Sequence, residues 1–168
     1  MNRRQSNRVP AVLETSFWVA ACEAEVAANC LDLFEIVVPH AVEVEIGTGQ
    51  VGFPDREYPY ATLFRHLRGQ MRNPPEPAPE PIGLFGAGEA EAIALAQHLD
   101  ANLLINDRRP AAYAAARNLA VVTVPAVILR LRSANIISER AARRKLALIE
   151  HITSPVFMEQ ARKVLDSL

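Results

Sequence analysis

Four acidic residues stand where apolar strands or alanine-rich helices are expected to begin or end: Glu14, Glu45, Glu89 and Asp107. They lie far apart in the sequence, but a folded α/β domain would bring these ends together. Carboxylates at the edge of a core are costly unless a positive charge lies among them. Hard oxygen ligands suit Mg²⁺ or Mn²⁺. The four acids therefore indicate a divalent metal site suited to phosphodiester hydrolysis.

Glu14 and Asp107 each follow a predicted strand. Residues 9–14 read as a short buried strand that ends at Glu14, and the apolar run 103–105 comes just before Asp107. In parallel sheets the working groups gather beyond the carboxyl ends of the strands. These two acids are therefore the strongest site candidates.

The other expected elements alternate between helix and strand, which predicts an α/β fold with a parallel sheet. Thr15 or Ser16 is expected to cap the first helix. A proline-rich stretch, residues 73–83, must be extended and is interpreted as an insertion within the domain. The expected helices cover residues 17–29, 39–46, 60–71, 88–99, 110–118 and 125–132, followed by one capped by Ser138 and one begun by Ser154 and Pro155, and the other two strands cover residues 36–38 and 120–124.

Length and composition fit a single domain. The chain has 168 residues, of which 50% are hydrophobic and 6% aromatic, so its core must consist of small aliphatic side chains. The formal net charge of −1 gives no bulk attraction to nucleic acid, so any such contact must come from local patches. Cys22 and Cys30 are interpreted as two small buried side chains of a cytosolic protein.

The N-terminal residues and the lengths of the apolar runs indicate where the protein is located. Residues 1–8 are interpreted as a flexible basic arm before a single domain at residues 9–168. Glu14 interrupts the apolar run that a signal peptide would need, and no stretch approaches 18 uninterrupted apolar residues. We therefore expect a cytoplasmic protein that does not span a membrane.

The order of four motifs resembles that of the PIN-domain nucleases, particularly the small prokaryotic ones related to VapC toxins. The resemblance covers nearly the whole chain, from Val9 to Leu168, and includes the final TSPVFMEQARKVL. Each motif carries one of the acids. In chain order they are Glu14-Thr15-Ser16, PHAVEVEI with Glu45, GEAEAIALA with Glu89, and LLINDRR with Asp107.

This resemblance implies a three-layer, Rossmann-like fold, dependence on Mg²⁺ or Mn²⁺, and cleavage of RNA. It also implies a homodimer and, for the toxin branch, a small antitoxin partner. Glu14 and Asp107 would bind the metal directly, and Glu45 and Glu89 would bind through water or a second ion. Ser16 would orient a metal-bound water. Such a site supplies an activated water and neutralises the charge that develops on phosphorus.

Three further residues are candidates for contact with RNA. Arg108 and Arg109 lie beside Asp107 and could bind phosphates. Asn106 could hold the scissile phosphate or a neighbouring carboxylate.

Simpler interpretations stay open for the acids. Glu14 and Glu89 could be favoured by a helix dipole, Asp107 could only cap a helix, and Glu45 could be a solvated helix residue. The resemblance also has a departure, because Glu14 stands where the family has Asp. A second hypothesis follows, in which the domain is degenerate and binds RNA or a protein partner without cutting. A third and weaker one is another Rossmann-like metal hydrolase, such as a small phosphatase.

Overall fold

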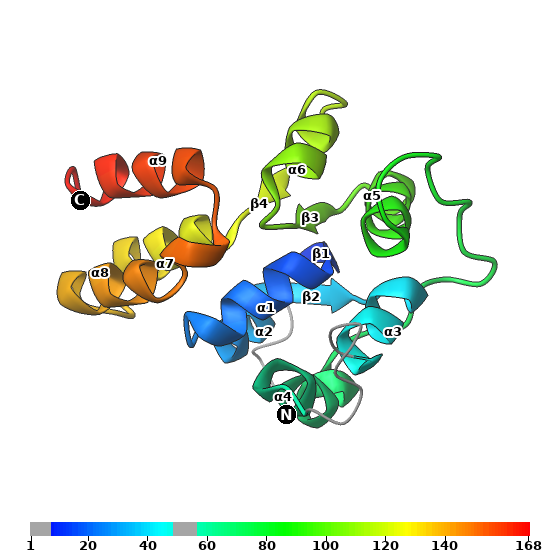
Figure 1. The fold of residues 1–168 in the computed structure, drawn as a ribbon, viewed down its shortest axis with the longest axis horizontal. Helices are drawn as coiled ribbons and strands as arrows, with labels where there is room; N and C mark the ends of the chain where they lie inside the picture. The colour runs from blue at the N-terminus through cyan, green and yellow to red at the C-terminus, as the bar shows by residue number, and fades with distance from the viewer. Residues whose placement is uncertain (1–7, 49–56) are drawn as a thin grey trace.

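The computed structural model describes residues 8–48 and 57–168. Most of the predicted basic arm, residues 1–7, lies outside the described residues. A four-stranded parallel sheet forms the centre, in the order β2-β1-β3-β4 (Figure 1). The strands are β1 (Val9–Leu13), β2 (Phe34–Val37), β3 (Asn102–Leu104) and β4 (Val121–Val122).

Helices surround the sheet, as expected for an α/β fold. Their N-termini follow the local signals of the sequence, such as Pro155 in the first turn of the last helix and the Ser138 side chain capping the one before it. The helices are α1 (Thr15–Glu23), α2 (Ala27–Leu33), α3 (His40–Thr48), α4 (Pro59–Leu67), α5 (Ala87–Leu99), α6 (Arg108–Ala115), α7 (Val124–Ser133), α8 (Glu139–Leu148) and α9 (Pro155–Leu165), with 3₁₀ turns η1 (Arg68–Gln70) and η2 (Glu150–Ile152).

Two hydrophobic clusters cover the two faces of the sheet. Along β1, Ala11 and Leu13 face one cluster and Val12 faces the other, as the two-residue period of a strand requires. The first cluster includes buried residues of α1 to α4 and of α7 to α9. The second includes α5 and α6. The predicted α/β fold, a parallel sheet flanked by helices, is confirmed.

The connections after β1 and β3 leave the sheet in opposite directions. α1 follows β1 and packs in the first cluster, through Phe17 and Trp18 among others. α6 follows β3 and packs in the second cluster through Ala111 and Ala114. A crevice is expected where neighbouring parallel strands diverge in this way, beyond their carboxyl ends. Glu14 and Asp107 both stand at this point.

The first helix differs from the prediction at both ends. It is capped by Glu14 and not by Thr15 or Ser16, because the extended residue before the first turn lies one position earlier. It also ends at Glu23 and does not run on to Asn29. The chain turns at Glu25, whose φ of 57° lies in the left-handed region, before α2 begins.

The segment around Arg72 lies along the outer side of β2. The Arg72 N–H donates to the carbonyl of Ile36, and the Val38 N–H donates to the carbonyl of Arg72, at 2.8 and 3.1 Å. The α-helix expected over residues 60–71 ends earlier than predicted, because α4 stops at Leu67 and the 3₁₀ turn η1 follows it. The proline-rich stretch that follows has no helix or strand, as predicted. No helix in the described part of the chain is long and apolar enough to cross a membrane.

Candidate functional site

Glu14 is a buried carboxylate at the carboxyl end of β1. Glu14 as a whole is 3% exposed. Its backbone N–H donates to the carbonyl of Leu104 in the neighbouring strand β3, at 3.0 Å. Burial raises the pKa of Glu14 from 4.5 to about 7, the hydrogen bonds from Ser16 oppose this rise, and the negative charges of Glu89 and Glu45 add to it. The ionised form of this carboxylate is therefore destabilised unless a cation binds to it.

The Ser16 hydroxyl joins the ends of β1 and β3. It donates to Oε2 of Glu14 and accepts from the backbone N–H groups of Asn106 and Asp107, at 3.0 and 3.1 Å. The Ser16 N–H also donates to Oε2 of Glu14, at 2.8 Å. All of these bonds use one oxygen of Glu14, and Oε1 has no hydrogen-bond partner among the described residues. Ser16 thus fixes the carboxylate and leaves one oxygen available for a ligand.

Glu45 reaches the site from α3 and is held at both oxygens. Oε1 accepts from the backbone N–H of Gly88 at 2.9 Å, and Oε2 accepts from the Thr15 hydroxyl. The approach to α5 is very close, because a Cβ on Gly88 would lie 2.7 Å from Cδ of Glu45. The residue at position 88 must therefore be glycine for Glu45 to keep this position.

Glu89 lies in the first turn of α5, directly after Gly88. Its Oε2 accepts from the backbone N–H of Gly86 at 2.8 Å, which satisfies one of the unpaired donors at the start of the helix. Its other oxygen has no partner among the described residues. Glu89 therefore combines the expected role at the helix start with a place beside Glu14, whose pKa it raises.

Asp107 caps α6 and is exposed. Its Oδ1 accepts from the backbone N–H of Arg109 at 3.1 Å. Asn106 beside it is 3% exposed and is bonded on both sides: its amide donates to the Thr153 hydroxyl at 2.9 Å, and its oxygen accepts from the Val124 N–H at 3.3 Å. Asn106 thus holds the chain behind the site, and its predicted contact with RNA would require these bonds to open.

The structure brings the predicted acids to one region. Glu14 experiences the charges of Glu45 and Glu89, and Ser16 binds both the Glu14 carboxylate and the Asp107 backbone. In residues 8–48 and 57–168, no lysine, arginine or histidine forms an ion pair with any of the four acids. Their charge is therefore not balanced by the described side chains.

The oxygen ligands of this region fit a hard divalent cation. Free carboxylate oxygens remain on Glu14, Glu89 and Asp107 among the described residues. In the same part of the chain, no three acidic, histidine or cysteine side chains are arranged to hold one ion. Mg²⁺ usually keeps several waters and takes one or two carboxylates, so a site of this kind needs no such trio.

Two of the residues that shape the site were not predicted as site residues. Thr15 was expected only as a cap, and Gly88 only as the start of a helix. The signal for Gly88 was present in the sequence, as the glycine that precedes Glu89 in GEAEAIALA. Thr153, which bonds Asn106 from the far end of the chain, gives no signal in the sequence.

The two arginines expected near RNA, Arg108 and Arg109, differ from the arginines of residues 65–72 in their surroundings. Arg65, Arg68 and Arg72 form ion pairs with acidic side chains, the second of them a two-pronged pair with Glu43 at 3.0 Å for both bonds. Arg108 and Arg109, at the start of α6, are exposed and form no ion pair with any described residue. Their predicted contact with phosphates stays a prediction.

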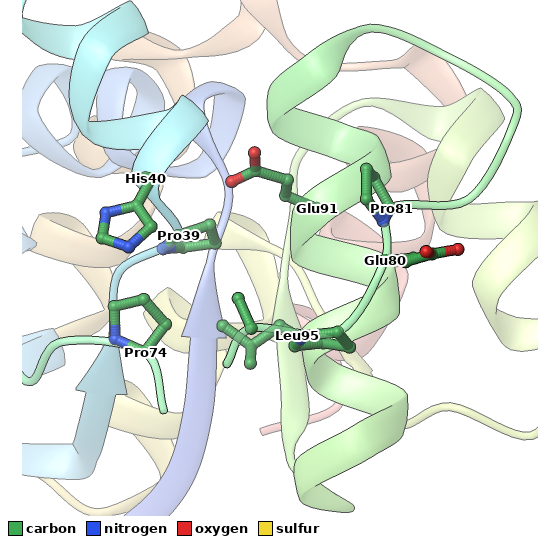
Figure 2. A pocket seen from close by; sticks show the side chains of 9 residues that line it. Pro39, His40, Pro74, Glu80, Pro81, Glu91 and Leu95 are labelled. Atoms are coloured by element: carbon green, nitrogen blue, oxygen red, sulfur yellow. The ribbon is translucent and has the colours of Figure 1, made fainter. Parts of the chain in front are cut away.

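A separate cavity of about 270 Å³ lies between the start of α3, α5 and the proline-rich stretch. Figure 2 shows Glu91 extending from α5 toward Pro39 and His40 at the start of α3. Its carboxylate accepts from the Ala41 N–H at 2.9 Å. Glu91 thus stabilises the first turn of the helix that carries Glu45.

Comparison with known proteins identifies the family. A family model described as a PIN domain matches residues 27–166, a range that contains Glu45, Glu89 and Asp107. A solved structure of a PilT N-terminus domain protein from the hyperthermophilic archaeon Sulfolobus solfataricus P2 is 14% identical, with a TM-score of 0.42 over 68% of this chain and 86% of that one. No curated protein matches the chain. The chain belongs to the PIN-domain family, whose members are generally nucleases that depend on a divalent metal ion.

Proposed function

We propose that this protein is a Mg²⁺- or Mn²⁺-dependent endoribonuclease that acts in the cytoplasm. The observation that carries the proposal is the environment of Glu14. This carboxylate is buried, two further carboxylates raise its pKa, and no described basic side chain pairs with it. A divalent cation would relieve all of these costs at once.

Glu14 and Asp107 are the proposed direct ligands, with Glu45 and Glu89 acting through water or a second ion. A bound divalent cation activates water and stabilises the charge on the phosphoryl oxygens. Ser16 keeps the Glu14 carboxylate in place, and Gly88 and Thr15 do the same for Glu45. Arg108 and Arg109 lie on the Asp107 side, where they would neutralise phosphates of an approaching strand.

The direct test is cleavage of single-stranded RNA by the purified protein with Mn²⁺. Asp107→Asn should abolish cleavage and leave the fold intact, because Asn also caps helices well. Glu14→Gln should abolish it as well. Asp166→Asn is the matched control, since Asp166 is exposed and pairs with Arg143 far along the chain. Cleavage that persists in Asp107→Asn would be due to a contaminant and would contradict the proposal.

The second candidate is a degenerate domain that binds RNA or a protein without cutting. It is supported by Glu14, which stands where the family has Asp. Glu14→Asp separates the two candidates, because Asp is a preferred N-cap residue and should keep the start of α1 intact. Metal binding that arises only in this variant would favour the degenerate domain.

We further propose that the protein is a homodimer and the toxin of a type II toxin–antitoxin pair. The support is the resemblance of its motifs to the VapC-related branch. Induced expression should arrest growth, Asp107→Asn should relieve the arrest, and a short neighbouring reading frame should encode the protein that neutralises it. Light scattering gives the oligomeric state. Growth unaffected by the native chain would contradict the toxin role.

A further inference from the structure

A small aromatic and basic patch lies beside the acidic site. It consists of Phe85, in the loop before α5, together with Arg109, Tyr113 and Arg117 on α6. Residues of the patch lie next to Glu89 on one side of the site and next to Asp107 on the other. Phe85 precedes Gly86, whose N–H binds Glu89, and the Arg109 N–H binds Asp107. A cavity of about 360 Å³ opens there, lined by Leu84, Phe85, Arg109 and Tyr113.

The two aromatic rings of this patch have different surroundings. Tyr113 is covered by Arg117, whose Cζ lies 3.5 Å from the ring centroid. Phe85 meets Tyr113 edge to face, with centroids 5.2 Å apart and an interplanar angle of 79°. The Arg109 Cζ is 6.0 Å from the Phe85 centroid, at the outer limit of a cation–π contact. Both rings line the cavity, but Arg117 lies over Tyr113, so Phe85 is the ring whose face is less covered.

The backbone of Phe85 also points to a binding role. Its φ is 67°, in the left-handed region that a bulky side chain rarely adopts. Such conformations cost energy and tend to persist at ligand-binding positions. The surrounding structure thus holds a half-buried aromatic side chain in a strained position at the edge of the acidic site.

The charge of the patch suits a polyanion. Arg109 and Arg117 of the patch, and Arg108 next to it, form no ion pair with any residue in the described ranges, so their charges are not neutralised there. Most of the other described arginines are used differently. Six of them pair with acidic side chains: Arg65, Arg68, Arg72, Arg143, Arg144 and Arg162.

We propose that Phe85 is a stacking site for an unpaired base of the RNA, with Arg109 and Arg117 binding the adjacent phosphates. Stacking on an aromatic ring tolerates any base and requires that the base be out of a duplex. The patch would hold the strand so that the neighbouring phosphodiester lies at the acids. This inference rests on the proposed function only in taking RNA as the substrate.

The test measures binding without cleavage. A fluorescently labelled single-stranded oligouridylate is titrated with the protein in EDTA at low salt, and its anisotropy is followed. Phe85→Leu keeps an apolar side chain but removes the aromatic face, and it should weaken binding by about five-fold to one hundred-fold. Phe85→Tyr should bind like the native chain. Arg109→Ala should weaken binding and also reduce its dependence on salt.

Two control variants match these changes. Tyr58→Ala removes a half-buried ring from a stacked pair with Tyr60. Tyr58 is the residue directly before α4, and α4 lies far from α6 (Figure 1). Arg140→Ala removes an exposed arginine from α8. Both should bind the oligonucleotide like the native chain. Thermal unfolding of each variant shows whether the fold is kept, and the rescue by Phe85→Tyr separates a lost contact from a damaged loop.

The outcomes separate this inference from the proposed function. Native affinity in Phe85→Leu, or equal affinity for a duplex of the same length, would overturn the inference even if the protein cleaves RNA. A change of oligomeric state in Phe85→Leu, without a change in RNA affinity, would mark the patch as a protein interface and would overturn it too. Stacking at Phe85 without any Mn²⁺-dependent cleavage would leave the inference standing and contradict the nuclease.

Discussion

Gly88 and Glu45 approach each other so closely that a Cβ on Gly88 would lie 2.7 Å from Cδ of the glutamate. The same pair is joined by the hydrogen bond from the Gly88 N–H to Oε1. The backbone of α5 therefore positions a carboxylate that belongs to α3. The identity of residue 88 controls an acid that lies 43 positions away in the sequence.

Gly88→Ala should reduce metal-dependent activity much more than stability. The Glu45 carboxylate can swing away from the new methyl group, so the free energy of unfolding should change by less than about 1 kcal/mol, and alanine is favoured in helices. The acid would nevertheless leave its position in the site. Gly47→Ala in α3 is the control, because nothing lies within 4 Å of a Cβ there. Equal cleavage rates for the two variants would contradict the role given to Gly88.

The stability of the metal-free protein should fall as the pH rises from about 4.5 to about 7. Burial raises the pKa of Glu14 from 4.5 to about 7. Between these pH values the folded state therefore binds more protons than the unfolded one. The stabilising contribution is complete below about pH 4.5 and is lost as the pH passes through about 7. Its size is on the order of 3 kcal/mol, at about 1.4 kcal/mol for each tenfold change in proton affinity.

Urea unfolding of the native chain and of Glu14→Gln, in EDTA across this pH range, measures that contribution. The variant cannot ionise at this position, so its stability should depend less on pH and should exceed that of the native chain near pH 8. Parallel pH profiles for the two proteins would show that Glu14 does not titrate as described.

Binding of Mn²⁺ should become tighter as the pH rises through about 7. The cation competes with a proton for the Glu14 carboxylate, so binding should release a proton below this pH. Calorimetry in buffers of different ionisation enthalpy would detect the release. Glu14→Gln should show neither the release nor the Mn²⁺-induced rise in melting temperature. A proton release of the same size in the variant would assign it to another group.

Ser16→Ala should shift the pH dependence of activity upward. The Ser16 hydroxyl lowers the pKa of Glu14, and without it the carboxylate would ionise at higher pH. The variant also leaves the Asn106 and Asp107 N–H groups without their acceptor, at a cost of about 1–3 kcal/mol. Ser138→Ala is the matched control: it loses a helix cap on α8, costs about 1 kcal/mol and should leave the pH profile unchanged.

The sequence allowed the ends of strands and the starts of helices to be predicted where a local rule applies. β1 does end directly before Glu14, and Pro155 does begin α9. The break between α1 and α2 was missed, because neither glycine nor proline marks it and Glu25 takes the left-handed conformation instead. A residue other than glycine adopts that conformation only when the packing around it compensates the cost, which no local rule detects.

The contacts within the site were harder to predict than its residues. The motifs indicate which acids belong to the site, but not that Thr15 and Gly88 hold Glu45 or that Thr153 holds Asn106. These contacts join segments that are 30 to 47 positions apart. They depend on how α3, α5 and the chain before α9 pack around the sheet, and no spacing in the sequence encodes that packing.

The contact between Arg72 and β2 limits how two copies of this chain can associate. Exposed strand edges readily pair with strands of other molecules, and proteins that remain soluble cover or shorten them. Here the outer side of β2 already exchanges hydrogen bonds with Arg72, and the opposite edge strand, β4, has only two residues. A continuous sheet running through a dimer is therefore disfavoured, and self-association would have to use the helical faces.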